Sequence, residues 1–411
     1  MSAIAWGSVA LRDVASFSGG TTPPRARQAD YFDGGTVPWV KTLDLTNSVV
    51  SVTDERVTER AVSDTGLSIQ PTGTVLVAMY GGYNQIGRTG LLVQPATVNQ
   101  AITAVRPDRR RLDPEFLLHV LNHNVGYWRS VASSSRKDPN ITKEDVRSFR
   151  LPLPPLEEQR WIANAISDAN VLLESLEQNI TKKRALKQGM MQHLLTGRTR
   201  LPGFTSPWIN TTWGELIERC TSGATPLRSR PEFWGGPIPW VTSTELTYGT
   251  ILRVPQSITR EGFVAANLTL WSAGTFVMAI TGLEAAGTRG SCGLLGRHAA
   301  TNQSCMAIVP NAKLTAEFLY HFYTLRGEEL AFRYCQGTKQ QSFTAGIVRT
   351  LPIYVPTDKG EQDAIAHALR AADEEIATLQ RRWSKTLAIK TGMAQQLLTG
   401  RTLLPVPGAA A

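Results

Sequence analysis

The sequence predicts an α/β (α+β) fold that is built twice, as two similar globular domains in tandem, each followed by one long helix. Three observations support this. The two halves of the 411 residues match at a nearly constant shift. Each half opens with short apolar runs bounded by glycine and proline, and each closes with a long proline-free helical pattern.

The matches between the halves run in the same order along both copies, at a shift of 200 to 203 residues. Only small insertions therefore separate the copies, which indicates a tandem duplication. The matched pairs include GTTP at 20–23 with GATP at 223–226, PWV at 38–40 with 239–241, Asn99-Gln100 with Asn302-Gln303, Glu115-Phe116-Leu117 with Glu317-Phe318-Leu319, and LLTGRT at 194–199 with 397–402.

The duplication and the changes in composition divide the chain into five segments. We expect a first globular domain, a central helix, a second globular domain, a distal helix and a tail. Their predicted bounds are 1–155, 156–200, 201–356, 357–404 and 405–411.

Within each globular domain the apolar runs predict buried strands. The clearest are GTVLVAM at 73–79 and GTFVMAI at 274–280, which are continuous apolar runs after a glycine. Helical patterns follow at 114–131 and 315–334. Proline-rich joints then end each domain, because proline cannot continue a helix and restricts the residue before it.

The long helical segments carry apolar residues at heptad spacing, over more than four turns in each copy. A sustained heptad pattern predicts a coiled-coil seam. The predicted seam consists of Ile162, Ala169, Leu176 and Met190 in the first helix and Ile365, Ala372, Leu379 and Met393 in the second.

Charge favours an antiparallel arrangement of these helices. The first half of each is rich in Asp and Glu, and the second half is basic. An antiparallel pair sets acidic halves against basic halves, whereas a parallel pair stacks like charges. We therefore expect an antiparallel coiled coil with pseudo-twofold symmetry. The same distribution also suits the dipole of each separate helix.

Several function classes lack their motifs. The sequence has no P-loop, no GxGxxG after a strand, no Asn-Pro-Pro-aromatic tetrapeptide of an amino-methyltransferase and no GxSxG elbow. Its four cysteines show no CxxC spacing, so we expect buried free thiols and no metal site. The net charge of +9 permits a nucleic-acid partner. We expect no catalysis by this chain alone. Because no apolar run is long enough to span a membrane, we expect a cytoplasmic protein.

The first joint and its helix carry a family resemblance. The sequence LPLPPLEEQ at 151–159, leading into a helix that ends LLTGR at 194–198, resembles the specificity (S) subunit, HsdS, of type I restriction–modification systems. The second joint, at 351–362, has three extra residues and retains only the Glu-Gln pair. The order of globule, helix, globule and helix is similar to that family over essentially the full chain.

The resemblance implies a non-catalytic DNA specificity subunit. The globules would be target-recognition domains, each reading one half of a bipartite target in double-stranded DNA. The helices would fix the spacing and dock two modification (methyltransferase) subunits, directing adenine methylation and, with restriction (motor/nuclease) subunits, cleavage. It also implies no cofactor in this chain, with S-adenosylmethionine, ATP and Mg²⁺ on partner subunits only.

Three polar loops at matching places in both copies are the candidate DNA contacts, because recognition residues gather on loops of a rigid scaffold. The middle pair differs in composition, as two different half-sites would require. The alternative interpretation is ordinary solvated turns. The candidates are Thr22, Arg25 and Arg27 with Thr225, Arg228 and Arg230; Tyr80, Tyr83, Asn84, Gln85 and Arg88 with Thr281 and Arg289; and Ser135, Arg136 and Lys137 with Lys339, Gln340 and Gln341.

Two other functions remain open from the sequence. The chain could be a protein–protein scaffold, with two α/β modules on a coiled coil and no DNA readout. It could also be an enzyme whose centre carries no known motif. Salt-dependent preference for one split DNA sequence distinguishes the DNA-reading hypothesis from both.

Overall fold

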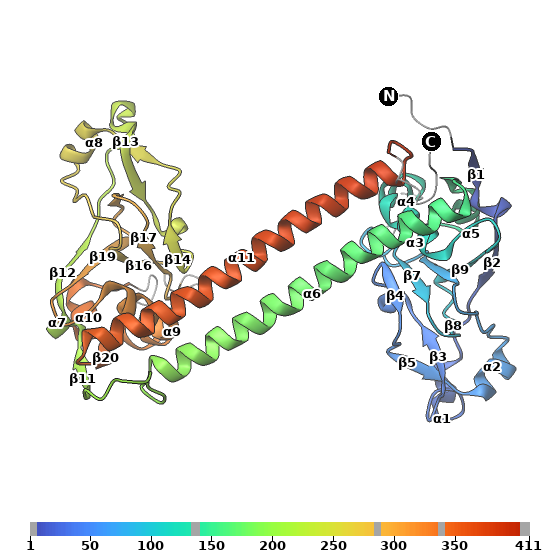
Figure 1. Cartoon of the computed structure of the whole chain (residues 1–411), viewed down its shortest axis with the longest axis horizontal. Helices are drawn as coiled ribbons and strands as arrows, with labels where there is room; N and C mark the ends of the chain where they lie inside the picture. Colours follow the sequence, from blue (N-terminus) through green and yellow to red (C-terminus); the bar gives the residue numbers. More distant parts are fainter. Residues whose placement is uncertain (1–5, 133–139, 283–288, 336–341, 403–411) are drawn as a thin grey trace. The chain divides into compact units, whose positions relative to one another are not determined.

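The computed structural model describes residues 6–132, 140–282, 289–335 and 342–402, in two compact units. Unit 1 comprises Met1–Glu177 and Arg381–Ala411, and unit 2 comprises Gln178–Gln380. Each unit holds one globule, the first half of the long helix that follows it, and the second half of the other long helix (Figure 1). Among the described residues, no helix is both long and apolar enough to cross a membrane.

The globule of unit 1 contains three sheets. The largest has the strand order β2-β9-β6-β7-β4, the second has the order β5-β3-β8, and the third pairs β1 with β10. Its elements are β1 (Ser8–Ala10), η1 (Leu11–Asp13), β2 (Ala15–Gly19), η2 (Arg25–Arg27), α1 (Gln28–Tyr31), β3 (Val37–Val40), η3 (Thr42–Asp44), β4 (Ser48–Val50), β5 (Glu55–Val57), α2 (Glu59–Thr65), β6 (Val75–Ala78), β7 (Thr89–Leu92), β8 (Thr97–Val98), β9 (Ile102–Pro107), α3 (Pro114–His123), α4 (Val125–Val131), α5 (Lys143–Ser148) and β10 (Arg150–Pro152).

The globule of unit 2 repeats this plan strand for strand. Its sheets have the orders β12-β19-β16-β17-β14, β15-β13-β18 and β11-β20, so the predicted duplication is confirmed in the topology. Its elements are β11 (Trp208–Thr212), α7 (Trp213–Leu216), β12 (Ile217–Ser222), η4 (Pro231–Phe233), β13 (Trp234–Val241), η5 (Ser243–Glu245), β14 (Gly249–Ile251), β15 (Ser257–Ile258), α8 (Arg260–Ala265), β16 (Phe276–Ala279), β17 (Cys292–Leu295), β18 (Ala300–Thr301), β19 (Cys305–Pro310), α9 (Ala316–Tyr334), α10 (Ala345–Thr350) and β20 (Pro352–Pro356).

The predicted buried strands are the central strands β6 and β16. All four residues of each are buried, because each strand is flanked by two others and covered on both faces. The predicted helix at 114–131 is wrong as one element. It breaks into α3 and α4 at Asn124, whose side-chain amide donates to the Val120 carbonyl at 2.7 Å. The second copy keeps one helix, α9.

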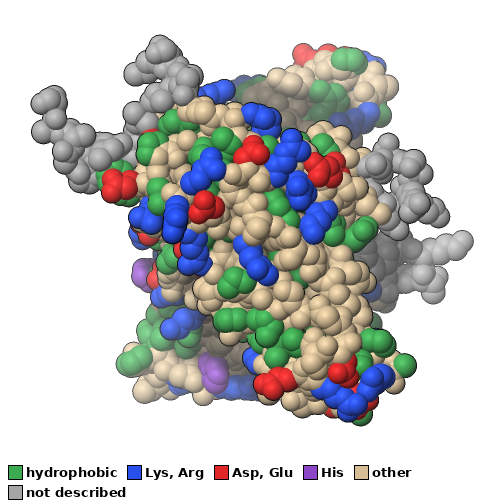
Figure 2. Space-filling view, turned by 90° about the vertical axis from the view of Figure 1, so that its right-hand side faces the viewer, with side chains coloured by type: hydrophobic (Ala, Val, Ile, Leu, Met, Phe, Trp, Pro, Cys, Tyr) green, Lys and Arg blue, Asp and Glu red, His purple; other side chains and the backbone are tan. Residues whose placement is uncertain are grey.

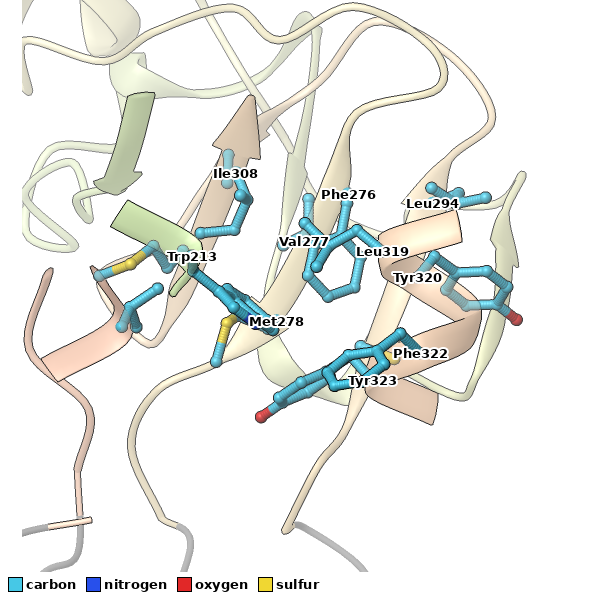
Figure 3. Packing of buried hydrophobic residues seen from close by; sticks show 14 of the residues in the cluster. Trp213, Phe276, Val277, Met278, Leu294, Ile308, Leu319, Tyr320, Phe322 and Tyr323 are labelled. Atoms are coloured by element: carbon cyan, nitrogen blue, oxygen red, sulfur yellow. The ribbon is translucent and has the colours of Figure 1, made fainter. Parts of the chain in front are cut away.

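Aromatic side chains fill the core of unit 2 between its large sheet and α9. Trp213, Phe276 and Tyr323 are fully buried, and their ring centroids lie 5.7 to 6.3 Å apart in edge-to-face pairs. Figure 3 shows these rings together with Val277, Met278 and Leu319. Each such ring pair contributes about 0.5–1.5 kcal/mol beyond its burial.

The glutamine of each Glu-Gln pair has a structural explanation. The buried amide of Gln159 donates to the carbonyls of Arg111 and Pro154 and accepts from the Asp113 N–H, all at 2.8 Å. In unit 2, Gln362 makes the same three bonds at 2.9 Å, to Lys313, Pro356 and Thr315. Each glutamine therefore ties a joint to the start of its long helix and to the N-terminus of α3 or α9.

The long helices are α6 (Leu156–Leu194) and α11 (Lys359–Leu397), and they run antiparallel within each unit (Figure 1). In unit 2 the second half of α6 pairs with the first half of α11 through Lys183–Glu375 at 2.7 Å and Lys187–Asp373 at 2.6 Å. These ion pairs are the acid-to-base contacts that the charge pattern predicts. Each helix is followed by a glycine in the left-handed region, Gly197 and Gly400, which LLTGRT supplies in both copies.

The seam residues differ in burial. Ile162, Leu176 and Ile365 are buried, whereas Ala169, Met190, Ala372, Leu379 and Met393 are half-buried. Ile162 and Met393 pack into the core of unit 1, and Ile365 and Met190 into that of unit 2. The helices thus pack against the globules as well as against each other. Leu186 and Ile389 continue the heptad pattern, yet their side chains are 52% and 55% exposed.

Candidate nucleic-acid interface

A short turn with the sequence Asn-Gln connects β8 to β9 in unit 1 and β18 to β19 in unit 2. The Asn99 side-chain oxygen accepts from the Ala101 N–H at 3.1 Å, and Asn302 accepts from Ser304 at 3.0 Å. This bond within the turn leaves the following side chain, Gln100 or Gln303, exposed. We call 99–101 and 302–304 the Asn-Gln turns.

The first predicted loop packs directly against this turn. A Cβ atom on Gly20 would lie 1.9 Å from the Val98 carbonyl oxygen, so this approach requires glycine. The Trp39 indole donates to the Thr21 carbonyl at 3.2 Å, and the Thr22 hydroxyl donates to the Gln100 side-chain oxygen.

Unit 2 repeats each of these contacts. Gly223 approaches the Thr301 carbonyl oxygen as closely, with 1.7 Å for an added Cβ. Trp240 donates to the Ala224 carbonyl at 3.0 Å, and Thr225 donates to Gln303. The repeated sequence motifs GxTP, PWV and Asn-Gln, which lie far apart in the chain, therefore form one cluster in each unit.

The segments before the second loop and after the third loop lie beside the same turn. In unit 1 the Met79 N–H donates to the Ala101 carbonyl at 2.8 Å, and the Ile141 N–H donates to the Met79 carbonyl at 3.0 Å. In unit 2, Ile280 and Phe343 make the same two bonds, each at 2.9 Å. The structure thus brings together the segments that carry all three predicted loops.

The arginines of the first loop are engaged with their own unit. The Arg25 guanidinium lies 4.2 Å from the Phe32 ring centroid and pairs with Glu55 at 2.7 Å. Arg27 pairs with Asp30 at 2.9 Å, and this bond raises the pKa of the Arg27 guanidinium.

The matching arginines of unit 2 are engaged in a similar way. The Arg228 guanidinium lies 4.0 Å from the Trp234 ring centroid and donates to the Gln256 side-chain oxygen at 2.9 Å. Arg230 pairs with Glu232 at 3.3 Å. Arg228 therefore keeps a charge that no acid within the described residues neutralises by an ion pair.

The Gly-rich loop of unit 1 presents polar and aromatic side chains. Tyr80 and Tyr83 are 42% and 50% exposed, and Asn84 is exposed as well. The Arg88 guanidinium donates to the Asn84 carbonyl at 3.0 Å, which closes the loop and leaves the Asn84 amide outside it. Gln85 is half-buried against Gly81.

In unit 2 the corresponding loop is described only at its two ends. Thr281 forms a β-bridge with Ser342, and the Arg289 guanidinium lies 5.7 Å from the Phe332 ring centroid. The candidates of the third loop, namely Ser135, Arg136, Lys137, Lys339, Gln340 and Gln341, fall outside the described residues.

Sequence reasoning missed Gln100 and Gln303 as exposed polar groups of this interface. The signal was present, because Asn-Gln is one of the motifs shared by both halves. Glutamine is one of the side chains that make paired hydrogen bonds to adenine.

The histidines at matching places of α3 and α9 are buried. Burial, with the nearby Lys390 ammonium, lowers the pKa of His119 to about 4, and burial with Lys187 and Arg370 lowers that of His321 to about 3. The described residues contain no group of three or more His, Cys, Asp or Glu placed to bind a metal.

The four cysteines are free, as expected from the sequence. Cys292 and Cys305 are buried, and burial raises the pKa of both thiols, to about 12 for Cys292. Cys220 and Cys335 are only half-buried, so the prediction of buried thiols is wrong for these two.

A family model described as "Type I restriction modification DNA specificity domain" matches the chain twice, over residues 4–183 and 205–385. The chain is 21% identical over 185 residues to the Escherichia coli EcoR124I/EcoR124II specificity subunit, covering 44% of this chain and 45% of that protein. It is 27% identical over 189 residues to the MjaIX specificity subunit of Methanocaldococcus jannaschii, covering 44% of this chain and 42% of that protein. Each match spans less than half the length of the relative.

The fold is similar to solved structures of this kind. A type I restriction–modification S subunit from M. genitalium has a TM-score of 0.64 at 14% identity, with 96% of each chain covered. A chain from a study of complex assembly and conformational transition in the type I system has a TM-score of 0.53 at 16% identity, covering 96% of this chain and 97% of that chain.

Proposed function

Because the chain belongs to the type I restriction–modification DNA specificity family, we propose that each unit reads one half of a split target in double-stranded DNA. The observation that carries the proposal is a shared frame with divergent loops. Both units keep the GxTP loop, the Asn-Gln turn and the tryptophan beneath them, while the adjacent loop is YGGYNQIGR in one copy and TGLEAAGTR in the other.

In unit 1 the proposed base reader is Asn84, with Gln85 beside it. Asparagine and glutamine amides make paired hydrogen bonds to adenine in the major groove, each worth about 1–3 kcal/mol of discrimination. The exposed rings of Tyr80 and Tyr83 flank this pair and offer apolar contact to bases. The Asn-Gln turn, common to both units, would contact DNA in the same way in each.

The proposal includes no chemistry by this chain. Specificity subunits direct the adenine methylation and the cleavage that partner subunits carry out. S-adenosylmethionine, ATP and Mg²⁺ would belong to those partners, in the cytoplasm. A protein scaffold without DNA contact is the alternative.

Two modification subunits would dock on equivalent apolar surfaces of the long helices. On α6, Ala185, Leu186, Gly189 and Met190 line a groove of about 780 Å³. The same positions of α11 are Ala388, Ile389, Gly392 and Met393, and Ile389 is as exposed as Leu186. A large apolar side chain held in solvent at the same place in both copies favours a partner that binds twice.

The docking test uses Leu186→Glu and Ile389→Glu. We expect each variant to bind one modification subunit instead of two, and the double variant to bind none. The matched control is Gln178→Glu, which adds the same charge on α6 outside the groove. Two bound subunits in both single variants would reject these surfaces.

The DNA-reading test is a gel-shift titration of the complex with co-produced modification subunits, using duplexes with one base pair changed at a time. We expect affinity that falls with salt and depends on two separated blocks of sequence. Asn84→Ala should weaken discrimination in one block only. Binding that ignores sequence in every position would contradict DNA reading, and absence of any salt-dependent binding would support the scaffold.

A further inference from the structure

Unit 1 carries a group of exposed arginines whose guanidinium groups are held by uncharged acceptors. Arg111 donates to the Asp13 carbonyl at 2.8 Å, and Arg150 donates to the Ser8 carbonyl at 2.7 Å. Arg109 donates to the Thr72 carbonyl, and the half-buried Arg106 donates to the Gln70 side-chain oxygen at 3.0 Å. We call Arg106, Arg109, Arg111 and Arg150 the arginine face.

These contacts fix the orientation of each guanidinium without neutralising it. Within the described residues, none of the four forms an ion pair with an acid, whereas arginines elsewhere in the unit, such as Arg25 and Arg60, do. Oriented but uncompensated guanidinium groups are the donors that bind phosphate best.

The elements that carry the arginine face are linked to one another. β1 pairs with β10, η1 follows β1 directly, and β2 pairs with β9, with Ser16 opposite Arg106. The Asp108 N–H donates to the Val14 carbonyl at 2.8 Å and holds the segment that bears Arg109 and Arg111 against β2. Figure 2 shows unit 1 from the side that is on the right in Figure 1, where Lys and Arg side chains outnumber acidic ones.

The surrounding charges add to this excess. Arg12, in η1, and Arg147, in α5, both pair with the single carboxylate of Glu144, at 3.1 and 3.2 Å. Two cations therefore share one acid.

The described residues of unit 2 do not repeat these arginines, although the fold is the same. The positions of Arg106, Arg109 and Arg150 are Val309, Ala312 and Pro352, and the run DRRRL at 108–112 is shortened to NAKL at 311–314. The arginine face is therefore not part of the shared frame. It serves something that meets unit 1 and not unit 2.

The arginine face and the Asn-Gln turn lie at opposite ends of the same pair of strands. β2 leads into the GxTP loop and β9 begins after the turn, while Arg106, Arg109 and Arg111 follow at the far end of β9. Six residues of strand span about 20 Å, the length of about six base pairs. A duplex read at the turn and lying along this ladder would reach the arginines.

We propose that the arginine face binds the phosphate backbone of the DNA duplex beyond the bases that unit 1 reads, without regard to sequence. This rests on the proposed function, since it extends the path of the same DNA. Phosphate contacts of this kind fix the register of a protein on DNA and add affinity equally at every sequence.

The test compares Arg109→Gln/Arg111→Gln/Arg150→Gln with wild type in complex with the modification subunits. Anisotropy titrations at several salt concentrations use one duplex with the target and one with the target scrambled. Loss of three phosphate contacts should lower the slope of log affinity against log salt by about 2.7, and affinity at 0.1 M salt by roughly 100-fold or more. The ratio of the affinity for the target duplex to the affinity for the scrambled duplex should stay unchanged.

The matched control is Arg253→Gln/Arg260→Gln/Arg297→Gln, which removes the same charge from exposed positions of unit 2. We expect a much smaller change in slope. A second duplex is shorter by six base pairs at the end nearer the half-site that unit 1 reads. This shortening should weaken DNA binding by wild type and leave DNA binding by the arginine-face variant unaffected.

Three outcomes would overturn the inference. An unchanged slope in the triple variant means that no DNA lies on this face. A changed ratio of the affinities for the target and the scrambled duplex means that the arginines read bases. Full DNA affinity together with loss of a partner subunit on co-purification means that the face binds an acidic protein. If wild type itself shows no salt-dependent DNA binding, the proposed function fails first.

Discussion

At the scale of residues, two glycines determine how closely the first loop approaches the Asn-Gln turn. The space for a side chain at Gly20 and Gly223 is already occupied by a main-chain carbonyl group. The neighbouring Gly19 has no heavy atom within 4 Å of an added Cβ. The sequence showed that glycine recurs at 20 and 223. Only the structure shows the reason, because the carbonyl groups belong to residues about 78 positions away.

Gly20→Ala should therefore destabilise unit 1 by about 3 kcal/mol, since a backbone carbonyl cannot move away as a flexible side chain can. Urea unfolding measures this change. Gly19→Ala is the control, with an expected change within about 0.5 kcal/mol. Equal stability of the two variants would contradict the close approach.

The buried histidines predict how stability depends on pH. In the unfolded chain the pKa of a histidine side chain is about 6.5. In the native protein, burial lowers the pKa of His119 to about 4. The unfolded state therefore binds more protons between these values. Through His119 alone, the free energy of unfolding should fall by about 1.4 kcal/mol per pH unit between pH 6.5 and about pH 4, with no effect above pH 6.5.

Urea unfolding at pH 7 and pH 5.5 checks this in wild type, in His119→Gln and in His298→Gln, whose side chain is exposed. His119→Gln should lose about 1.4 kcal/mol less than wild type on acidification. His298→Gln should behave as wild type. If His119→Gln keeps the full loss, protonation of this buried ring is not the cause.

At the scale of elements, heptad spacing and charge predicted the two long helices and their antiparallel pairing, although the predicted segments 156–200 and 357–404 run six and seven residues past the observed helix ends. The same spacing could not distinguish the buried seam from the exposed apolar positions that are proposed to dock a partner. Leu186 and Ile389 fit the heptad pattern but stay exposed, because near each helix end the apolar face that is covered packs on a globule. The apolar pattern also could not predict the break between α3 and α4 at Asn124, since the pattern continues across it.

The ion pair between Lys187 and Asp373 gives a test of the antiparallel pairing. Asp373→Lys should place two cations together at a lysine whose side chain is only 16% exposed, and so destabilise unit 2 by about 1–2 kcal/mol. The charge-swapped double variant Lys187→Asp/Asp373→Lys should recover most of that loss in urea unfolding. A double variant no more stable than the single one would contradict the contact.

At the scale of the whole molecule, the duplication carried most of what the sequence could predict. Matching motifs identified the two copies, and the structure repeats the strand order of all three sheets. The convergence of GxTP, PWV and Asn-Gln into one cluster could not be foreseen, because their meeting depends on long-range strand pairing. The arginine face is present in one copy only, so a comparison of the motifs that both copies share does not identify it.

The central claim is that two units of one chain read two halves of one DNA target. The most direct measurement maps methylated adenines in DNA from cells that carry this chain with its modification subunits. We expect one motif with two blocks of defined sequence, separated by a spacer of constant length. An uninterrupted motif, or methylation that follows no motif, would contradict the account.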